Sequence, residues 1–321
     1  MRNRQHQVTK PFYCIVAGLV GTLLLSCLTG PSDTWKTRNA EIIQKHGLKG
    51  RERAIADVDV VPSLQPGKVY EFTDLPVIDI ASGVRATIAW GRGALVEFVE
   101  MAPGALYPEE ILRAELISVV QEGSAICVLD TGNLELSKNA VVYLTEGTKH
   151  SLRAGPNGCK AIEVFSPVRI DHLNLAGAEL SEGANTSFPD QTAEPSLQPG
   201  RVYDLNQIPF TPLTKDASAR SRLIWGKNAQ LSFIRMDPSS SFPLHFHPED
   251  QLMVTLQGEL DQTIIDRVYT LDGDRRRTLF LPGGMVHGAA ISEFGAEALD
   301  VFWPVRPDYV QYARKEAASQ R

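Results

Sequence analysis

The sequence of 321 residues predicts an all-β protein built from two β-barrel domains in tandem. The length leaves room for two domains, because single domains commonly run to about 100 to 150 residues. The chain also repeats itself internally. Finally, many of its segments are short, alternating and β-rich, as at residues 230–236, and turns such as 271–274 separate them. Many short strands with Gly and Pro turns are typical of sandwiches and closed barrels.

The internal repeat is the strongest of these observations. The segment Ser-Leu-Gln-Pro-Gly-Lys-Val-Tyr occurs twice, with Arg in place of Lys in the second copy. Further matches follow in the same order, which indicates a duplication of a whole domain. The matching segments are 63–70 with 196–203, 89–91 with 224–226, 101–103 with 236–238, and 164–169 with 301–306.

These matches predict a first domain at 62–175 and a second at 196–321. The stretch between them, 176–195, is rich in Gly, Ser, Glu, Asn and Pro and has no apolar period, so we expect a linker there. Residues 28–61 precede the first domain as a spacer. The charged, Ala-containing part at 37–57 predicts a short helix with little to bury.

The N-terminus predicts export. Arg2, Arg4 and Lys10 precede an apolar run at 11–25, which is typical of a signal peptide ending at residue 27 and too short for a spanning helix of roughly 18 to 20 apolar residues. The end of this run, Leu-Leu-Ser-Cys27, resembles the bacterial lipoprotein box. That resemblance implies a protein anchored by a lipid at Cys27, in the periplasm or at the cell surface. A plain cleaved signal peptide is the alternative.

Composition limits the partners and the redox chemistry. The net charge of −6 and the absence of a long basic run argue against nucleic acid as a partner. Beyond the leader and Cys27, the sequence contains Cys127 and Cys159, which export would allow to form a disulfide but which are equally compatible with free thiols. No CxxC motif is present, so structural zinc and thiol-redox functions are excluded.

The second copy contains a pattern of metal-ligand residue types. His245 and His247 are spaced i, i+2, so on a strand they face one side, and Gln251 keeps the same parity if the strand is regular. His287 follows a Pro-Gly-Gly turn that can deliver it from a neighbouring strand. Three imidazoles and an amide oxygen predict one divalent transition metal, with Zn or Ni favoured and Fe, Mn or Cu as alternatives.

These residues resemble the two cupin motifs, G-x5-H-x-H-x3,4-E-x6-G and G-x5-P-x-G-x2-H-x3-N. The resemblance includes the paired histidines, Gly258, Pro282, Gly284 and His287, and it implies a cupin jelly-roll barrel. The chain departs from the motifs at four positions, since Gln251 replaces Glu, Ser239 and Arg276 replace the opening glycines, and Ile291 replaces Asn. A neutral amide leaves more positive charge on the metal, which favours Lewis-acid chemistry over an Fe(II) oxygenase.

Downstream, Asp300, Phe302 and Arg306 alternate on one face of a predicted strand. If that face lines the barrel, a carboxylate, an aromatic ring and a guanidinium approach the metal. The alternative is an Asp–Arg ion pair at the barrel rim.

Together with the histidine motifs, Asp-x-Phe-x-Pro-x-Arg resembles the pectin-degradation cupins of the KdgF type, which open the ring of 4,5-unsaturated uronates. The resemblance covers only the second copy. It implies that His245, His247, Gln251 and His287 bind the metal, and that Asp300 is the acid/base, Arg306 the carboxylate clamp and Phe302 a ring contact. Two alternatives remain: a non-catalytic carbohydrate- or metal-binding surface lipoprotein, and a cupin dioxygenase or isomerase for another small polar molecule.

The first copy lacks this set of ligands. Aligned without gaps from the match of Met101 with Met236, it has Glu110 at the position of His245, Leu112 at that of His247 and Leu116 at that of Gln251. Only His150 matches a ligand residue, His287, when the register is taken instead from the closing match of 164–169 with 301–306. We therefore predict that the first barrel has lost the metal site and packs against the second as an intrachain pseudo-dimer. Glu163 and Arg169 match Asp300 and Arg306, which leaves a remnant anion site open.

Overall fold

The computed structural model describes residues 34–51, 53, 55, 58–178, 180, 186 and 193–319. The predicted signal peptide, Cys27 and most of the predicted linker lie outside these residues. Within the described part of the chain, no helix is both long and apolar enough to cross a membrane.

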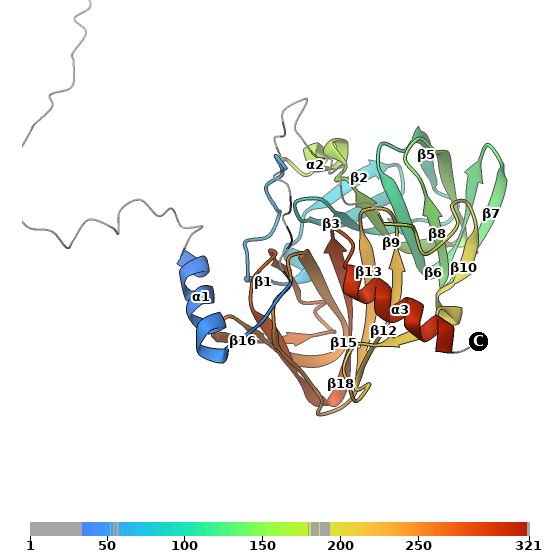
Figure 1. The fold of residues 1–321 in the computed structure, drawn as a ribbon. Helices are drawn as coiled ribbons and strands as arrows, with labels where there is room; N and C mark the ends of the chain where they lie inside the picture. The colour runs from blue at the N-terminus through green and yellow to red at the C-terminus, as the bar shows by residue number, and fades with distance from the viewer. Residues whose placement is uncertain are drawn as a thin grey trace, which may run out of the picture.

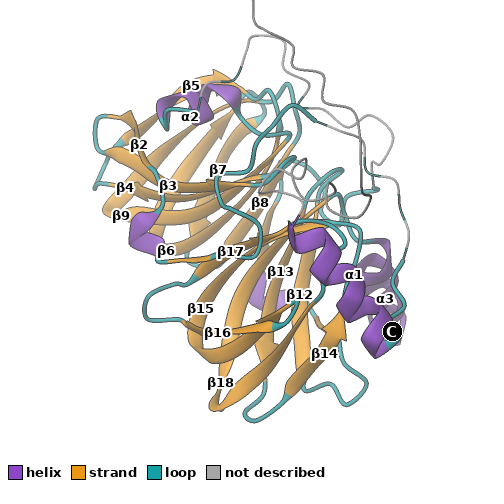
Figure 2. Cartoon of the chain, turned by 90° about the vertical axis from the view of Figure 1, so that its left-hand side faces the viewer, coloured by secondary structure: helices purple, strands orange, loops and turns teal. Residues whose placement is uncertain are grey.

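The chain forms two antiparallel sheets of nine strands each, which confirms the predicted all-β, jelly-roll fold class (Figure 2). The first sheet has the order β10-β8-β6-β9-β4-β3-β2, with β5 paired to β9 and β7 paired to β6. Its strands are β2 (Val77–Ala81), β3 (Val84–Trp90), β4 (Leu95–Met101), β5 (Leu106–Ile111), β6 (Glu115–Leu129), β7 (Gly132–Ser137), β8 (Ala140–Leu144), β9 (Lys149–Ser166) and β10 (Val202–Asp204).

The second sheet repeats this topology with the order β1-β17-β15-β18-β13-β12-β11, where β14 pairs with β18 and β16 with β15. Its strands are β1 (Val69–Tyr70), β11 (Phe210–Pro212), β12 (Ala219–Trp225), β13 (Gln230–Met236), β14 (Ser241–His245), β15 (Asp250–Ile264), β16 (Arg267–Asp272), β17 (Thr278–Leu281) and β18 (His287–Trp303).

The two barrels exchange a short strand. By sequence β1 belongs to the first copy, but it pairs with β17 of the second sheet, where Val69 lies opposite Leu279. In return β10 pairs with β8 of the first sheet, and Val202 lies opposite Val142. Figure 1 shows blue β1 beside the orange strands and yellow β10 beside the green ones. Each sheet therefore includes a strand from the other copy.

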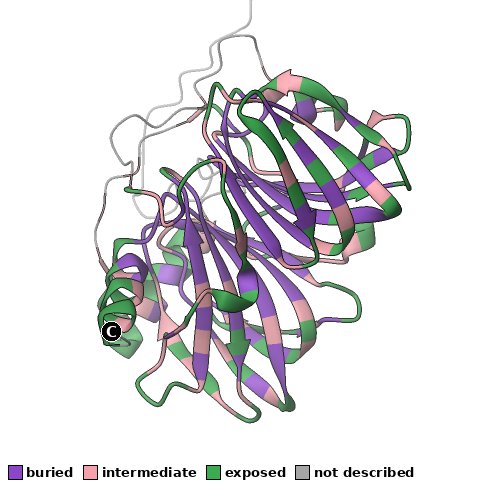
Figure 3. Ribbon diagram, turned by 90° about the vertical axis from the view of Figure 1, so that its right-hand side faces the viewer, coloured by how far each residue is buried: buried purple, intermediate pink, exposed green. Residues whose placement is uncertain are grey.

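An apolar cluster contains buried side chains from both copies. Figure 3 shows buried residues along the strands of both sheets. Burying apolar surface stabilises the folded chain by roughly 25 cal/mol per Å². Members from the first copy include Val96, Ile117 and Tyr143, and members from the second include Leu231, Phe280 and Leu299.

The longest strands bend at glycines, and the bends allow each sheet to curl. In the second barrel Gly258 interrupts the register of β15 with β18 and has a φ of +70°. A Cβ atom there would lie 2.1 Å from the carbonyl oxygen of Gly295, so only glycine fits. Gly123 repeats this geometry in the first barrel.

Helices are short and lie outside the sheets. They are α1 (Thr34–His46), α2 (Ile170–Leu175) and α3 (Pro307–Ser319), with 3₁₀ turns η1 (Phe72–Asp74) and η2 (Leu205–Gln207). The expected spacer helix is α1, but it is not a free spacer. Ile42 is buried in the apolar cluster of the second barrel, and Figure 1 shows α1 beside that barrel. The docking surface comes from residues more than two hundred positions away, which local sequence could not indicate.

Candidate metal centre

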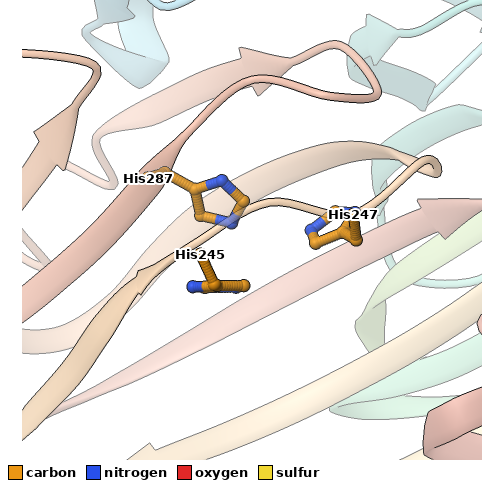
Figure 4. Close-up of side chains that lie close together, drawn as sticks. All are labelled: His245, His247 and His287. Carbon is orange, nitrogen blue, oxygen red and sulfur yellow. The ribbon is translucent and has the colours of Figure 1, made fainter. Parts of the chain in front are cut away.

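Three histidine side chains gather at one point in the second barrel. His245 ends β14 and lies directly opposite His287, the first residue of β18. His247 follows β14 by two residues, and a ligand atom from each of the three imidazoles lies within 4.8 Å of the others. Figure 4 shows the three rings turned toward a shared space. His247 and His287 are buried, whereas His245 is partly exposed, so solvent reaches the group from the His245 side.

Each imidazole is held in the tautomer that a metal ligand needs. Nδ1 of His245 donates to the carbonyl oxygen of Pro243 at 2.9 Å, Nδ1 of His247 to that of Glu249 at 2.9 Å, and Nδ1 of His287 to that of Met285 at 2.8 Å. Nε2 of each ring is then left with a lone pair. Ligand histidines in proteins commonly use their second nitrogen in this way.

Burial keeps these rings neutral. It lowers the pKa of His245 to about 4 and holds the pKa values of His247 and His287 well below the usual range, with the charge of Arg306 acting in the same direction. Neutral imidazole is the form that binds a metal ion.

Gln251 supplies an oxygen beside the histidines. Its Nε2 donates to Oδ1 of Asp300 at 2.8 Å, and this bond turns Oε1 toward Nε2 of His247 at 3.2 Å. The two facing atoms both carry lone pairs, so they attract each other only through a cation between them. Two ligand atoms at about 2.1 Å from one ion and at right angles to each other are about 3.0 Å apart. The donor set therefore fits a divalent metal ion.

The backbone delivers Gln251 differently from the regular strand that the spacing suggested. β14 ends at His245, a loop carries His247, and β15 begins at Asp250, so His245 and Gln251 come from different strands. The loop packs on the Pro-Gly-Gly turn, where a Cβ on Gly283 would lie 1.9 Å from the carbonyl oxygen of Pro248. The condition of a regular strand is therefore not met, because the chain leaves β14 after His245 and turns before β15, so neither His247 nor Gln251 continues the strand of His245.

Asp300 lies inside the barrel, on β18. It is 7% exposed, and burial raises its pKa to about 7, although the bond from Gln251 and the charge of Arg306 oppose the shift. The side chain lines the same cavity as His245 and His287. The structure thus places Asp300 on the interior face rather than in a rim ion pair.

Phe302 and Arg306 are also buried at this site. The Phe302 ring meets His247 edge-on with centroids 5.5 Å apart, and the Arg306 guanidinium lies 4.9 Å from the Phe302 ring. Arg306 pairs with Asp308, with Nη2 donating to Oδ2 at 2.8 Å. This pairing and the stacking fix the plane of the guanidinium.

Tyr309 is a site residue that the sequence analysis missed. It lines the cavity, is 5% exposed and lies under the Arg306 guanidinium at 3.8 Å from ring centroid to Cζ. Burial raises its pKa to about 12, so the phenol keeps its proton. Pro307 and Asp308 together form a helix-start signature that could have placed this residue one turn beyond Arg306.

The cavity at the site is small, with a volume of about 40 Å³. Typical pockets for drug-sized ligands measure about 300 to 1,000 Å³. The apolar lining includes Ile234, Met236 and Met253, and His247, which contacts Gln251, is not among the lining residues. The polar lining consists of His245, Gln251, Gln262, His287, Asp300, Arg306 and Tyr309.

The first barrel has an ion-pair network at the equivalent place. Glu110 lies opposite His150 as His245 lies opposite His287. Leu112 occupies the place of the second histidine. Its carbonyl oxygen accepts from the backbone N–H of Gly147, just as the carbonyl oxygen of His247 accepts from that of Gly284. Arg169 donates to both carboxylate oxygens of Glu110 at 2.6 and 2.7 Å, so this carboxylate is already neutralised.

Two further observations concern the first barrel. Among the described residues, only the three histidines of the second barrel form a cluster of three or more His, Cys, Asp or Glu side chains close enough to share an ion. Cys127 and Cys159 are buried free thiols rather than a disulfide, and burial raises the pKa of each to about 12.

Comparison with known proteins identifies relatives by fold alone. No family model matches the sequence, and no curated protein matches it. Among solved structures, AerE from Microcystis aeruginosa matches with a TM-score of 0.54 at 11% identity, over 72% of this chain and 98% of its own. A cupin 2 conserved barrel domain protein from Leptotrichia buccalis matches at 0.50 and 13% identity, over 77% and 100%.

Oxalate decarboxylases match over both barrels. The enzyme from Lactobacillus farciminis, in a formate complex, has a TM-score of 0.55 at 14% identity over 79% of this chain and 88% of its own. The Bacillus subtilis enzyme, which has Mn(II) centres, has 0.54 at 15% identity over 81% and 84%. At these identities the likeness concerns the fold, and this protein has the jelly-roll fold of the cupin proteins.

Proposed function

We propose that the second barrel is a metal-dependent enzyme for a small carboxylate-bearing substrate, and that this substrate is a 4,5-unsaturated uronic acid. One observation carries the proposal. A buried carboxylate, Asp300, and a buried guanidinium, Arg306, line the same small cavity as His245, Gln251 and His287. A site that only binds a metal needs neither group.

The residues have distinct roles in this proposal. His245, His247, Gln251 and His287 hold the ion, which as a Lewis acid withdraws charge from coordinated oxygens. Arg306 binds the substrate carboxylate, and Phe302 packs against the sugar ring. Ring opening breaks the bond between C1 and the ring oxygen. A proton leaves the C1 hydroxyl and another is delivered to C4, which gives the aldehyde and the keto group, and Asp300 is the group that moves a proton.

The cavity volume favours a second candidate. At about 40 Å³ it suits a carboxylate of few carbons better than a hexuronate. The oxalate decarboxylases that share the fold act on such a molecule by name. A panel of substrates separates the two candidates.

The proposal includes a location. We place the enzyme outside the cytoplasm, held to the membrane by a lipid on Cys27, where it meets products of extracellular polysaccharide breakdown. A buried lipid chain contributes about 0.8 kcal/mol per CH₂. Cys27→Ser should therefore move the protein from the membrane fraction to the soluble fraction. Unchanged association with the membrane would instead indicate an uncleaved signal anchor.

The test begins with the metal. Purified protein should contain one divalent ion per chain by mass spectrometry, and two tightly bound ions would contradict a single site in the second barrel. Activity is followed as the loss of ultraviolet absorbance of an unsaturated uronate. The metal-loaded protein should consume it, whereas chelated protein and His287→Ala should not. If only smaller carboxylates are consumed, the second candidate is correct, and if none is, the enzyme proposal fails.

A further inference from the structure

The segment that precedes the first barrel contacts the metal centre of the second. We call residues 34–53, comprising α1 and the chain after it, the N-terminal arm. It lies against the second barrel although the whole first barrel separates the two in sequence (Figure 1). Ile42 is buried there, and Gly50 sits so close to the Phe246 ring that a Cβ would lie 2.0 Å from it.

Near His287 the arm is held by Asn39, which is 6% exposed. Its Nδ2 donates to the carbonyl oxygen of Gly284 at 2.8 Å, and its Oδ1 accepts from the backbone N–H of Val286 at 2.7 Å. These two bonds lie on either side of Met285, whose carbonyl oxygen accepts from Nδ1 of His287. Asn39 therefore fixes the turn that orients this imidazole.

A second set of contacts lies beside His247. Arg51 donates to both carboxylate oxygens of Glu249, at 3.2 and 2.8 Å. Arg53 reaches the same carboxylate at 3.3 Å and the carbonyl oxygen of Val305 at 3.0 Å. Glu249 is completely buried, and its own carbonyl oxygen accepts from Nδ1 of His247.

The arm also reaches the predicted substrate clamp. Arg51 pairs with Asp308 at 3.0 Å, and Asp308 in turn pairs with Arg306. One guanidinium thus joins the loop that carries His247 to the helix start that holds Arg306. The remaining histidine, His245, donates from Nδ1 to the carbonyl oxygen of Pro243 on its own strand, which the arm does not hold.

We propose that the N-terminal arm is a working part of the metal centre, in which Asn39, Arg51 and Arg53 are positioning residues. They act through the carbonyl groups of Met285 and Glu249, which set the orientation of His287 and His247. The inference rests on the proposed metal-binding function. A group that hydrogen-bonds a ligand histidine directly is typically worth about 10- to 100-fold in metal affinity, and the arm residues hold such groups in place from one step further out.

The test measures Co²⁺ binding to the full chain by competition with a chromophoric chelator. Asn39→Ala and the double variant Arg51→Ala/Arg53→Ala should each bind about tenfold more weakly than wild type, the lower end of the loss seen when a direct partner of a ligand histidine is removed. Their visible Co²⁺ spectra should also change, because the ligand geometry changes. Arg51→Lys/Arg53→Lys should recover part of the affinity, since it restores the charge but not the bidentate contact.

Arg38→Ala is the matched control. Arg38 lies on the same arm and pairs with Asp266 at 2.7 Å, but this pair is exposed and does not touch either ligand segment. The Co²⁺ affinity and the visible spectrum of Arg38→Ala should equal those of wild type. The single variants Arg51→Ala and Arg53→Ala leave Glu249 with one partner, so they test the loop even if the double variant does not fold.

The outcomes separate the two proposals. If wild type binds Co²⁺ and the Asn39 and arginine variants bind it with the same affinity and spectrum, the arm only packs against the barrel and the inference is wrong. If wild type itself binds no Co²⁺, both this inference and the proposed function are overturned. If Arg38→Ala weakens binding as much as the others, docking of the whole arm matters rather than the named contacts, which also contradicts the proposal.

Discussion

In the proposed function, Asp300 serves two purposes in the second barrel. Its Oδ1 accepts from Gln251 and so orients a metal ligand, while its position in the cavity suits it to proton transfer. An Asn side chain preserves the first purpose, because its carbonyl oxygen can still accept that bond. It abolishes the second, because an amide does not exchange a proton near neutral pH.

We therefore predict that Asp300→Asn lowers turnover about 10²- to 10⁴-fold while the metal content stays at the wild-type level. The measurements are kcat on the best substrate and metal analysis of the same sample. Glu163→Gln is the matched control, because Glu163 occupies the corresponding strand position in the first barrel and should leave activity unchanged. Full activity of Asp300→Asn would remove the proton-transfer role.

Arg306 is expected to act on binding instead. Its guanidinium lies 3.8 Å from the centroid of the Tyr309 ring and 4.9 Å from that of Phe302, and it keeps donors beyond those bonded to Asp308. Arg306→Lys keeps the charge but loses the planar fork, so KM should rise about tenfold or more with a smaller change in kcat. Arg85→Ala, an exposed variant in the first barrel, should not change KM. An unchanged KM in Arg306→Lys would contradict the clamp.

At the scale of single elements, the strands β9 and β18 show how one framework supports two different interiors. Glu163 faces Glu97 across β4 and β9, and Asp300 faces Ser232 across β13 and β18. The first barrel thus places two acidic side chains side by side where the second has one. Burial raises the pKa of Glu163 to about 8, and the charges of Glu97 and Glu110 add to the shift.

This pKa predicts a pH dependence of stability. The folded chain keeps the Glu163 proton up to about pH 8, whereas the unfolded chain releases it near the ordinary pKa of 4.5. Between these values the folded state binds more protons, so the free energy of unfolding falls as pH rises, by at most about 1.4 kcal/mol per pH unit. Glu163→Gln has no such proton to lose.

The stability of Glu163→Gln relative to wild type should therefore increase from pH 5 to pH 8 and level off above it. Urea unfolding at a series of pH values measures the difference. Glu135→Gln, at an exposed position of β7, is the control and should follow wild type at every pH. A constant difference between Glu163→Gln and wild type would mean that the Glu163 pKa is not raised.

At the scale of the whole molecule, the contact between the barrels is specific as well as apolar. Glu115, 4% exposed, accepts backbone N–H groups of Lys227, Asn228 and Ala229 from the other copy, at 2.6, 2.9 and 2.9 Å. In the second barrel, Asp250 accepts two hydrogen bonds from Arg92 of the first barrel, at 2.8 and 2.6 Å. These contacts and the exchanged strands join the halves.

Glu115→Ala should destabilise the whole chain, because three buried N–H groups lose their acceptor. Each group left without a partner costs about 1 to 3 kcal/mol, so a loss of several kcal/mol in the free energy of unfolding is expected. Urea unfolding followed by circular dichroism measures it. The exposed variant Glu122→Ala serves as the control. A loss below about 1 kcal/mol would show that water replaces the carboxylate and that the apolar cluster alone holds the barrels.

Local sequence patterns were sufficient for part of this structure. Alternating apolar residues and turn residues predict strands because both signals act between neighbours, and the repeat predicts two copies because each copy must bury its own interior. His245, His247 and His287 were predicted from spacing and a turn, and the fold brings them together. The alternation of 300 and 302 indicated a shared face of β18, and both side chains are buried at the cavity. Arg306 was expected on the same strand face, but β18 ends at Trp303, and Arg306 reaches the cavity from the segment that follows the strand.

The tertiary structure alone decided the contacts between distant segments. The turn between His247 and Gln251, the bond from Gln251 to Asp300 and the pairing of Glu110 with Arg169 depend on how separate strands meet. The pairing of β10 with β8 joins segments about 60 residues apart, and the pairing of β1 and the docking of the arm through Asn39 and Arg51 join segments about 200 residues apart or more. Patterns of neighbouring residues contain no record of such partners, because the free energy of these contacts arises only once the barrels have closed.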